Sequence, residues 1–335
     1  MNLEKCLIIA EAGVNHNGDV ELALKLCDAA KQAGADVVKF QTWKTEKLIT
    51  HNVAQASYQR DNTGINESQY DMLKRLELSQ EDFVTIKKYC DKIGIVFAST
   101  ADESESLDFL VSIGIPFIKI GSGEIGNISY LRYIGAKKLP VILSTGMSTL
   151  ADVDISVCAL REGGATDITL LHCTTSYPCK YDDVNLNAMH TIREAFQLPV
   201  GYSDHTEGNT VAIAAVAMGA CVIEKHFTLD KHMEGPDHLA SADPEEFASM
   251  VSQIRNVEQA LGDGQKIPTK GEQEISNVVL KRIVAKRPIE KGKIITEDDI
   301  CVKRNDEGLL ASRWDDVLGS PASKCYSEDE GIALC

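Results

Sequence analysis

Short apolar segments alternate with amphipathic segments along most of the chain. Eight apolar segments are rich in Val, Ile, Leu or Phe, and each of them ends in polar residues. Continuous apolar runs of this length are typical of strands that are buried on both faces, as in a parallel sheet. The predicted strands are residues 6–11, 37–41, 95–100, 117–124, 141–146, 168–174, 199–205 and 222–227.

The segments between these strands carry apolar residues at helical spacing. Val20, Leu24 and Cys27 share one stripe of such a helix. Residues 79–92 and 206–219 show the same pattern. Eight strand–helix repeats over about 260 residues are the size of a (β/α)8 TIM barrel. A doubly wound open sheet is the alternative, but it usually has fewer strands, and no GxGxxG motif follows the first predicted strand.

Two segments depart from this repeat. Residues 42–78 form a long polar excursion, which is typical of a functional wall or lid, although a simple insertion is the alternative. Residues 263–281 contain Gly-Asp-Gly and Ile-Pro and predict a polar linker between a barrel domain, residues 1–262, and a small domain, residues 282–335. A segment of that size is only marginally stable as a free domain, so we expect it to pack against another surface.

The composition is that of a folded, acidic protein. Hydrophobic residues make up 44% of the 335 positions, so the chain can bury a large core. The formal net charge of −16 argues against nucleic acid or an anionic membrane surface as the main partner. No stretch approaches the roughly 20 apolar residues of a membrane span. Ten scattered cysteines without a CxxC motif favour buried free thiols, and we expect a cytoplasmic protein.

Polar and charged residues gather at the ends of the predicted strands. In a parallel barrel these ends open onto one face, where catalytic groups collect. A single such residue has ordinary explanations, such as a helix cap or a core histidine, but a whole rim of them does not, because buried charges need partners. The residues concerned are Glu11, Lys39, Gln41, Thr100, Lys119, Ser122, Glu124, Ser144, His172, Ser203, His205, Glu224 and His226.

Lys39 and Lys119 lie on this rim with several hydroxyl groups and with the turn formed by residues 121–123. Ammonium groups, hydroxyls and backbone N–H groups are what a phosphate or a carboxylate requires. The rim is therefore predicted to bind an anion, which would concentrate positive charge in one place of an acidic protein. Two separate Lys–Glu pairs are the alternative.

His205 and His226 end neighbouring predicted strands, so their imidazoles can meet. Two histidines with a nearby carboxylate such as Glu224 suit a divalent ion with positions left open for substrate. A pair of core histidines is the alternative. His172 and Cys173 are adjacent on a strand and point to opposite faces, so they cannot form a nucleophilic pair with each other.

Seven motifs resemble, in the same order, those of the sialic acid synthase family. They are IIAEAGVNHNG, VVKFQTWK, KIGSGE, ILSTGM, LLHCTTSYP, GYSDHT and VIEKHFTLDKHMEGPDHLAS, and with the C-terminal part they cover nearly the whole chain. Residues 282–335 are similar to the small antifreeze-like (SAF) domain that ends these enzymes. The pattern is most similar to that of the bacterial N-acetylneuraminate and N,N'-diacetyllegionaminate synthases.

This resemblance implies a cytoplasmic (β/α)8 enzyme that condenses phosphoenolpyruvate with an N-acyl mannosamine-type sugar and releases phosphate. With N-acetylmannosamine the product would be N-acetylneuraminate. The alternative acceptor, 2,4-diacetamido-2,4,6-trideoxymannose, would give N,N'-diacetyllegionaminate. The implied cofactor is a divalent ion, Mn²⁺ first, with Mg²⁺ or Co²⁺ as alternatives, and the implied assembly is a domain-swapped homodimer.

Other classes of protein fit the sequence less well. Phosphoenolpyruvate condensations that make eight-carbon or seven-carbon keto acids use phosphorylated sugars, and the rim lacks the further basic residues that these should need. A non-catalytic carbohydrate-binding protein is a more remote alternative, because a binder has no need of two rim histidines and three rim glutamates.

The resemblance also implies roles for individual residues. Those that match phosphoenolpyruvate contacts are Lys39, Thr100, Lys119, Ser122, Ser144 and Ser203, and those that match metal ligands are His205 and His226. Gln41, Tyr177 and Asp237 match contacts to the sugar, while Glu11, Glu124 and Glu224 match active-site carboxylates. Arg304 matches an arginine that the small domain inserts into the barrel of the partner subunit to hold the N-acyl group.

Three positions depart from the family pattern. Residues 99–102 read STAD where the family commonly has STPF, which changes the barrel-mouth loop beside Thr100. Ser176 stands where close relatives often have Glu, in the predicted sugar pocket. Residues 303–308 read KRNDEG where the family has a KRPG(N)G stretch, so Asn305 and Asp306 follow Arg304, and the loss of proline loosens the backbone there.

Overall fold

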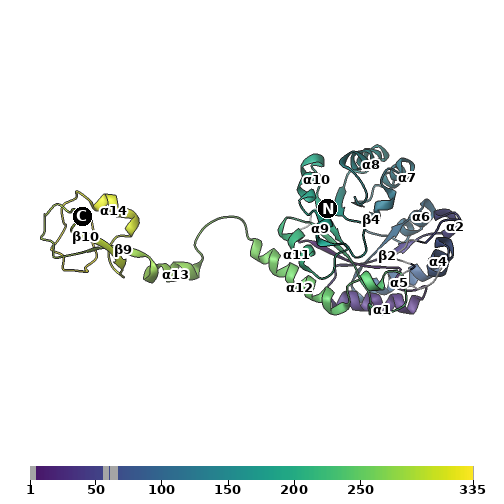
Figure 1. Ribbon diagram of the computed structural model, residues 1–335, viewed down its shortest axis with the longest axis horizontal. Coiled ribbons are helices and arrows are strands. Elements are labelled where there is room, and N and C mark those ends of the chain that lie inside the picture. The colour runs from purple at the N-terminus through teal and green to yellow at the C-terminus, as the bar shows by residue number, and fades with distance from the viewer. Residues whose placement is uncertain (1–4, 56–59, 61–66, 335) are drawn as a thin grey trace. The chain divides into compact units, whose positions relative to one another are not determined.

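The computed structural model describes residues 5–55, 60 and 67–334. It divides the chain into two compact units, Met1–Gly262 and Asp263–Cys335, which are drawn in Figure 1. Of the excursion predicted for residues 42–78, positions 56–59 and 61–66 lie outside the described residues. No helix in the described ranges is long and apolar enough to cross a membrane.

The first unit is a closed barrel of eight parallel strands, so the predicted (β/α)8 fold is confirmed. Each strand pairs with the next one in the sequence, and the last closes the barrel by pairing with the first. The strands are β1 (Leu7–Gly13), β2 (Val37–Thr42), β3 (Val96–Ala101), β4 (Ile118–Ile120), β5 (Val141–Ser144), β6 (Ile168–Cys173), β7 (Val200–Asp204) and β8 (Val222–His226).

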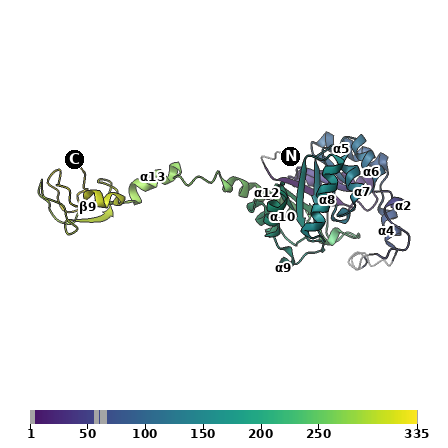
Figure 2. The same ribbon diagram turned by 90° about the horizontal axis from the view of Figure 1, so that it is seen from above.

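Helices surround these strands, as Figures 1 and 2 show. They are α1 (Val20–Gln32), α5 (Gln80–Ile93), α6 (Ser104–Ser112), α7 (Ile128–Gly135), α8 (Leu150–Gly163), α10 (Ala188–Phe196), α11 (Thr210–Ala217) and α12 (Pro244–Leu261), with the short α9 (Tyr181–Val184) before α10. Capping boxes begin α5, α8 and α12, where a Ser, Thr or Asp side chain accepts from the third backbone N–H of the helix. The largest hydrophobic core lies between the strands and this helical layer.

The interior of the barrel has an apolar floor with a polar layer above it. The floor is a buried cluster of Ile9, Val37, Ala98, Phe117, Ile142, Leu171 and Val222. Because strand side chains alternate between faces, the next inward position lies two residues closer to the C-terminal end of each strand. Those positions, which form the polar layer, are Glu11, Lys39, Thr100, Lys119, Ser144, Cys173 and Glu224. The apolar floor therefore excludes water from below and forces the polar groups to satisfy one another or a ligand.

In the barrel unit, two predicted elements differ from the observed ones. The fourth strand is predicted to run through residue 124, but it ends at Ile120, and Ser122–Glu124 forms the 3₁₀ turn η1. The excursion contains α2 (Thr45–Leu48) and α4 (Gln69–Leu76). Met72 and Leu76 of α4 pack with Trp43 and Val14 in a separate small cluster, so this part of the excursion covers the end of β1.

The second unit has its own small core around an antiparallel pair of strands. The pair is β9 (Lys281–Ala285) and β10 (Ile300–Arg304), followed by η3 (Ala311–Arg313) and α14 (Trp314–Val317). Helix α13 (Lys270–Val279) occupies most of the segment that is predicted as a linker, and none of its residues is buried. Among the described cysteines no disulfide forms, and Cys6, Cys27, Cys90, Cys173 and Cys179 are buried thiols.

Candidate active site

A cavity of about 220 Å³ lies at the C-terminal ends of the barrel strands. Twelve of the predicted site residues line it, namely Glu11, Lys39, Gln41, Thr100, Lys119, Ser122, Ser144, Tyr177, Ser203, His205, Glu224 and His226. These residues come from all eight strands or the loops after them, and the fold brings them together as the sequence predicts. Glu124, Asp237 and Arg304 do not line this cavity.

Two buried lysines share the carboxylate of Glu224 at the bottom of the cavity. Lys39 Nζ lies 3.7 Å from Glu224 Oε2, and Lys119 Nζ lies 3.3 Å from Glu224 Oε1. Lys39 also pairs with Glu11 at 2.7 Å. Burial works against ionisation of Glu224, but the charges of Lys119 and Lys39 outweigh it and lower the pKa of Glu224. Glu224 therefore stays ionised and holds both ammonium groups in place.

Hydroxyl groups complete the surroundings of the two ammonium groups. Lys39 donates to Thr100 Oγ1 at 2.9 Å, and Lys119 donates to Ser144 Oγ at 2.9 Å. Burial lowers the pKa of Lys119, although Glu224 opposes the effect, whereas Glu11 and Glu224 overcome burial and raise the pKa of Lys39. Two cations with adjacent hydroxyl donors form an anion-binding site.

A glycine in the loop after β5 allows the side chains in another part of the cavity wall to pack closely. The backbone N–H of Gly146 donates to Ser122 Oγ at 2.9 Å, and Ser122 Oγ lies 3.3 Å from Cys173 Sγ. A Cβ atom at Gly146 would lie 2.3 Å from Thr175 Oγ1 and 2.8 Å from Ser122 Oγ. A larger residue there would displace these side chains from the cavity wall, a requirement that the sequence motif ILSTGM contains but does not explain.

His205 and His226 lie side by side, with ring centroids 5.5 Å apart. His205 Nδ1 is 2.7 Å from the carbonyl oxygen of Thr174, which leaves its Nε2 for another partner. Burial lowers the pKa of both rings, that of His226 to about 3, so both imidazoles are neutral. His226 Nδ1 is buried and has no hydrogen-bond partner among the described residues. The ring of Tyr177 packs against both imidazoles, with its centroid 4.3 Å from that of His205 and 5.5 Å from that of His226.

Neutral imidazoles with free nitrogen atoms are the donors that a divalent transition-metal ion prefers. The orphaned nitrogen of His226 beside the ring of His205 fits such an ion. Within the described part of the chain, no group of three or more His, Cys, Asp or Glu side chains is placed to hold a metal. An ion held by His205 and His226 alone would leave its other positions to water and substrate.

A further buried ion pair lies on the outer face of β7 and β8, the strands that end at the two imidazoles. Lys225 Nζ is 2.7 Å from Asp204 Oδ2, and both side chains are buried. Asp204 Oδ1 accepts from the backbone N–H and the hydroxyl of Thr206, and Lys225 donates to the carbonyl oxygen of Thr206. The residues that flank His205 are thus tied to the residue that precedes His226, which fixes the separation of the two imidazoles.

The three remaining predicted residues lie elsewhere. Asp237 lines a neighbouring cavity of about 140 Å³ together with Gln41, Tyr177 and His226, and burial with the nearby charge of Glu11 raises its pKa to about 7. Glu124 is half-buried beyond the cavity rim and accepts from Asn127 Nδ2 at 2.7 Å. Arg304 ends β10 in the second unit, where its side chain is exposed. Ser176, the departure in the predicted sugar pocket, is also exposed.

Asp102 is a lining residue that the sequence analysis did not assign. It follows β3 directly and stands two positions after Thr100, so the alternation of a strand places both on the inner face. That spacing is the signal that could have identified it. Burial and the charge of Glu124 raise the pKa of Asp102 to about 7, while Lys39 opposes them.

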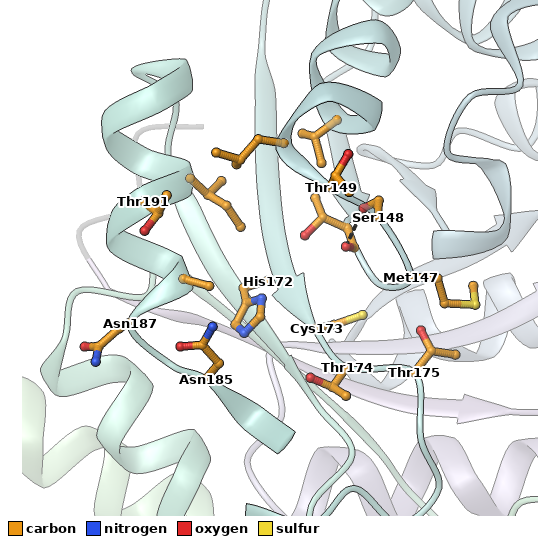
Figure 3. A pocket seen from close by; sticks show the side chains of 15 residues that line it. Met147, Ser148, Thr149, His172, Cys173, Thr174, Thr175, Asn185, Asn187 and Thr191 are labelled. Carbon is orange, nitrogen blue, oxygen red and sulfur yellow. Dashed lines mark hydrogen bonds between the residues drawn. The ribbon is translucent and has the colours of Figure 1, made fainter. Parts of the chain in front are cut away.

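A larger cavity of about 710 Å³ adjoins the first one, and the two share Met147, Cys173 and Thr175. In Figure 3 these three residues lie on one side of it, and Asn187 and Thr191 lie on the other. No Asp, Glu, Lys or Arg is among its lining residues. His172, which the sequence placed on the rim, lines this uncharged cavity and bonds the carbonyl oxygen of Val184 at 2.7 Å.

These features define a barrel enzyme with an anion site beside two neutral imidazoles. Comparison with known proteins gives its relatives. Residues 26–266 match the NeuB family model, and residues 282–333 match that of the SAF domain. The chain belongs to the NeuB family.

Three relatives span most of the chain. The N,N'-diacetyllegionaminic acid synthase of Legionella pneumophila is 48% identical over 95% of this chain and 90% of its own length. The enzyme of the same name from Campylobacter jejuni is 47% identical over 98% of this chain and 99% of its own length. The solved structure of an N-acetylneuraminic acid synthetase from Leptospira borgpetersenii is 34% identical, with a TM-score of 0.72 over 82% of this chain and 92% of that one. The predicted family, the SAF domain and the class of nonulosonic acid synthase are thereby confirmed.

The buried pair behind the imidazoles gives a stability prediction. Asp204→Asn leaves the charge of Lys225 buried without its counterion, which should lower the free energy of unfolding by about 3–5 kcal/mol. Urea unfolding followed by far-UV circular dichroism measures the change. Asp154→Asn, at an exposed position on α8, is the matched control and should change it by less than about 0.5 kcal/mol. A loss below about 1 kcal/mol for Asp204→Asn would contradict the structural role of the pair.

Proposed function

We propose that this enzyme condenses phosphoenolpyruvate with 2,4-diacetamido-2,4,6-trideoxymannose and releases N,N'-diacetyllegionaminate and phosphate. The observation that carries the proposal is a single cavity in which two hydroxyl-supported lysines face two neutral imidazoles. The choice of acceptor is supported by the names of the Legionella and Campylobacter relatives, which are nearly half identical over almost the full chain. N-acetylmannosamine is the second candidate, which the similarity to the Leptospira structure favours.

Lys39 and Lys119 would hold the phosphate and carboxylate groups of phosphoenolpyruvate. Ser144 and Thr100 already accept hydrogen bonds from these ammonium groups, so their hydroxyl protons point away from the lysines and are free for an anion. Ser122 and Ser203 line the same cavity and add two further hydroxyl groups. A substrate fixed at both ends has its reactive carbon oriented before the acceptor arrives.

The carboxylates would act on the charge that develops during the reaction. When the enol carbon C3 attacks the sugar aldehyde, positive charge develops at C2. Glu11 and Glu224 lie in the polar layer above the apolar floor with little access to water, so their negative charges act at high strength there. Water then adds at C2, and phosphate leaves by cleavage of its bond to carbon, next to the lysines that stabilise the departing anion.

His205 and His226 would hold a divalent ion, with Mn²⁺ as the first candidate. When bound, such an ion polarises the aldehyde oxygen of the open-chain sugar as a Lewis acid. The contacts of Asp204, Lys225 and Thr174 keep the two rings in place for this task. Tyr177, Gln41 and Asp237 line the adjoining cavity beside His226, and this position supports their assignment to the sugar.

We also propose a homodimer in which Arg304 reaches the barrel of the partner subunit. Arg304 is exposed at the end of β10, so it is accessible to another chain. Helix α13 exposes the apolar side chains of Ile275 and Val278, and exposed apolar groups of this kind are typical of an interface. The guanidinium group would donate to the carbonyl oxygen of the acceptor's N-acyl group.

The activity is tested by phosphate release from phosphoenolpyruvate. We expect turnover with Mn²⁺ and the 2,4-diacetamido sugar, a kcat/KM at least about tenfold lower with N-acetylmannosamine, and loss of activity after removal of the metal with a chelator. Preference for N-acetylmannosamine would reassign the acceptor. No phosphate release with either sugar would contradict the proposed function.

The swapped arrangement gives a separate prediction for Arg304. Arg304→Ala should raise the KM for the sugar about 10- to 100-fold, because a hydrogen bond from a charged group is lost, and should leave the affinity for phosphoenolpyruvate unchanged. Mixed dimers of the Arg304→Ala and Lys119→Gln chains should regain activity, since one barrel then has its lysine and receives an intact arginine from the other chain. Absence of this complementation would show that Arg304 serves its own barrel or none.

A further inference from the structure

Asp102 lines the anion site, and its carboxyl group has no partner within the described part of the chain. It lines the same cavity as Lys39 and Lys119. Among the described residues, no side chain or backbone group donates a hydrogen bond to its carboxylate, and no cation lies within ion-pair distance of it. Glu11 and Glu224, by contrast, are held by the two lysines. Asp102 is therefore the cavity carboxyl that is available to a ligand.

The charges that line the cavity do not favour an anionic ligand as they stand. Two lysines are present with three carboxyl groups, those of Glu11, Asp102 and Glu224. Phosphoenolpyruvate adds a carboxylate and a phosphate, so an ionised Asp102 would repel it at short range. Either one of these carboxylates takes up a proton when the substrate binds, or the substrate binds despite the repulsion.

Asp102 is better placed to be neutralised than Glu11 or Glu224, because each of these two has a lysine at ion-pair distance. The charged groups that face it are Glu124 of η1, Glu11 of β1, Glu103 at the start of α6 and Lys39 of β2, so three carboxylates act on it against one ammonium group. Burial and these carboxylates already raise its pKa to about 7. Glu224 is the least suited, because Lys119 and Lys39 hold it ionised.

We propose that Asp102 couples the binding of phosphoenolpyruvate to the uptake of one proton. The Asp102 carboxylate takes a proton from solvent as the substrate binds, and the carboxylic acid that forms donates a hydrogen bond to a substrate oxygen. This inference rests on the proposed function and identifies a substrate contact that the family pattern lacks, because the position holds Phe in the STPF stretch. An uncharged aromatic ring there needs no proton, so the coupling is a property of the carboxyl group in this chain.

Isothermal titration calorimetry with phosphoenolpyruvate tests the coupling. At about pH 8 the substrate phosphate is fully ionised, and titrations in two buffers of different ionisation enthalpy give the number of protons taken up. We expect the wild-type enzyme to take up about one proton, and its Kd to rise about tenfold for each pH unit above pH 7. Binding weakens as the pH rises because the bound state holds more protons than the free state.

Asp102→Asn separates this role from a structural one. The amide donates a hydrogen bond without a proton from solvent, so the variant should take up close to none. Its Kd should hardly change with pH, and at about pH 8 it should bind phosphoenolpyruvate about tenfold more tightly than the wild type. A merely structural residue would not produce tighter binding. Asp154→Asn, an exposed carboxylate on α8, is the matched control and should behave as wild type.

Two other outcomes discriminate between the inference and the proposed function. Unchanged proton uptake by Asp102→Asn, or by Asp102→Ser if the first variant does not fold, would overturn the inference and assign the proton to another group such as Glu11. No binding of phosphoenolpyruvate by the wild type would instead contradict the proposed function itself. Restored uptake in Asp102→Glu would support a direct role for the carboxyl group.

Discussion

The carboxylate of Glu224 determines what the barrel mouth can bind. Two ammonium groups would repel each other this close together, and both are buried above an apolar floor where water cannot solvate them. Glu224 compensates both, at 3.7 Å from Lys39 and 3.3 Å from Lys119. The lysines are thereby fixed as a pair, with hydroxyl groups around them, before any substrate arrives. An anion site of this kind needs little rearrangement on binding, and such preorganisation is what electrostatic catalysis requires.

Strand β8 connects this anion site to the proposed metal site through three consecutive residues. Glu224 points inward to the lysines, Lys225 points outward to its buried partner Asp204, and His226 points inward beside His205. Because the side chains alternate along a strand, one short segment fixes the lysine pair, the outer ion pair and one imidazole at the same time. A change to the lysine–Glu224 cluster or to the Asp204–Lys225 pair is therefore expected to disturb both the anion site and the imidazoles, although the proposed function gives these two groups different parts of the substrates.

The sequence predicted the barrel and most of the cavity because both depend on short-range patterns. Buried parallel strands are continuous apolar runs, and the polar residue that ends each run lies at the common rim, so residues as distant as Glu11 and His226 were expected to meet. Asp102 was not assigned, because its role depends on which carboxyl groups find a cation, and that is a three-dimensional property. The same applies to Gly146, whose importance lies in the contacts that a Cβ atom would make. The contact proposed for Arg304 would lie between two chains, and a single chain does not contain it.

The central claim is that the paired lysines and the paired imidazoles form one site for phosphoenolpyruvate and a divalent ion. A crystal structure of the enzyme soaked with Mn²⁺ and phosphoenolpyruvate, with anomalous diffraction to locate the metal, tests it most directly. We expect an anomalous peak bound by His205 and His226, and the phosphate and carboxylate groups of the substrate within hydrogen-bond distance of Lys39 and Lys119. Phosphoenolpyruvate bound away from both lysines, or a metal bound away from both histidines, would contradict it.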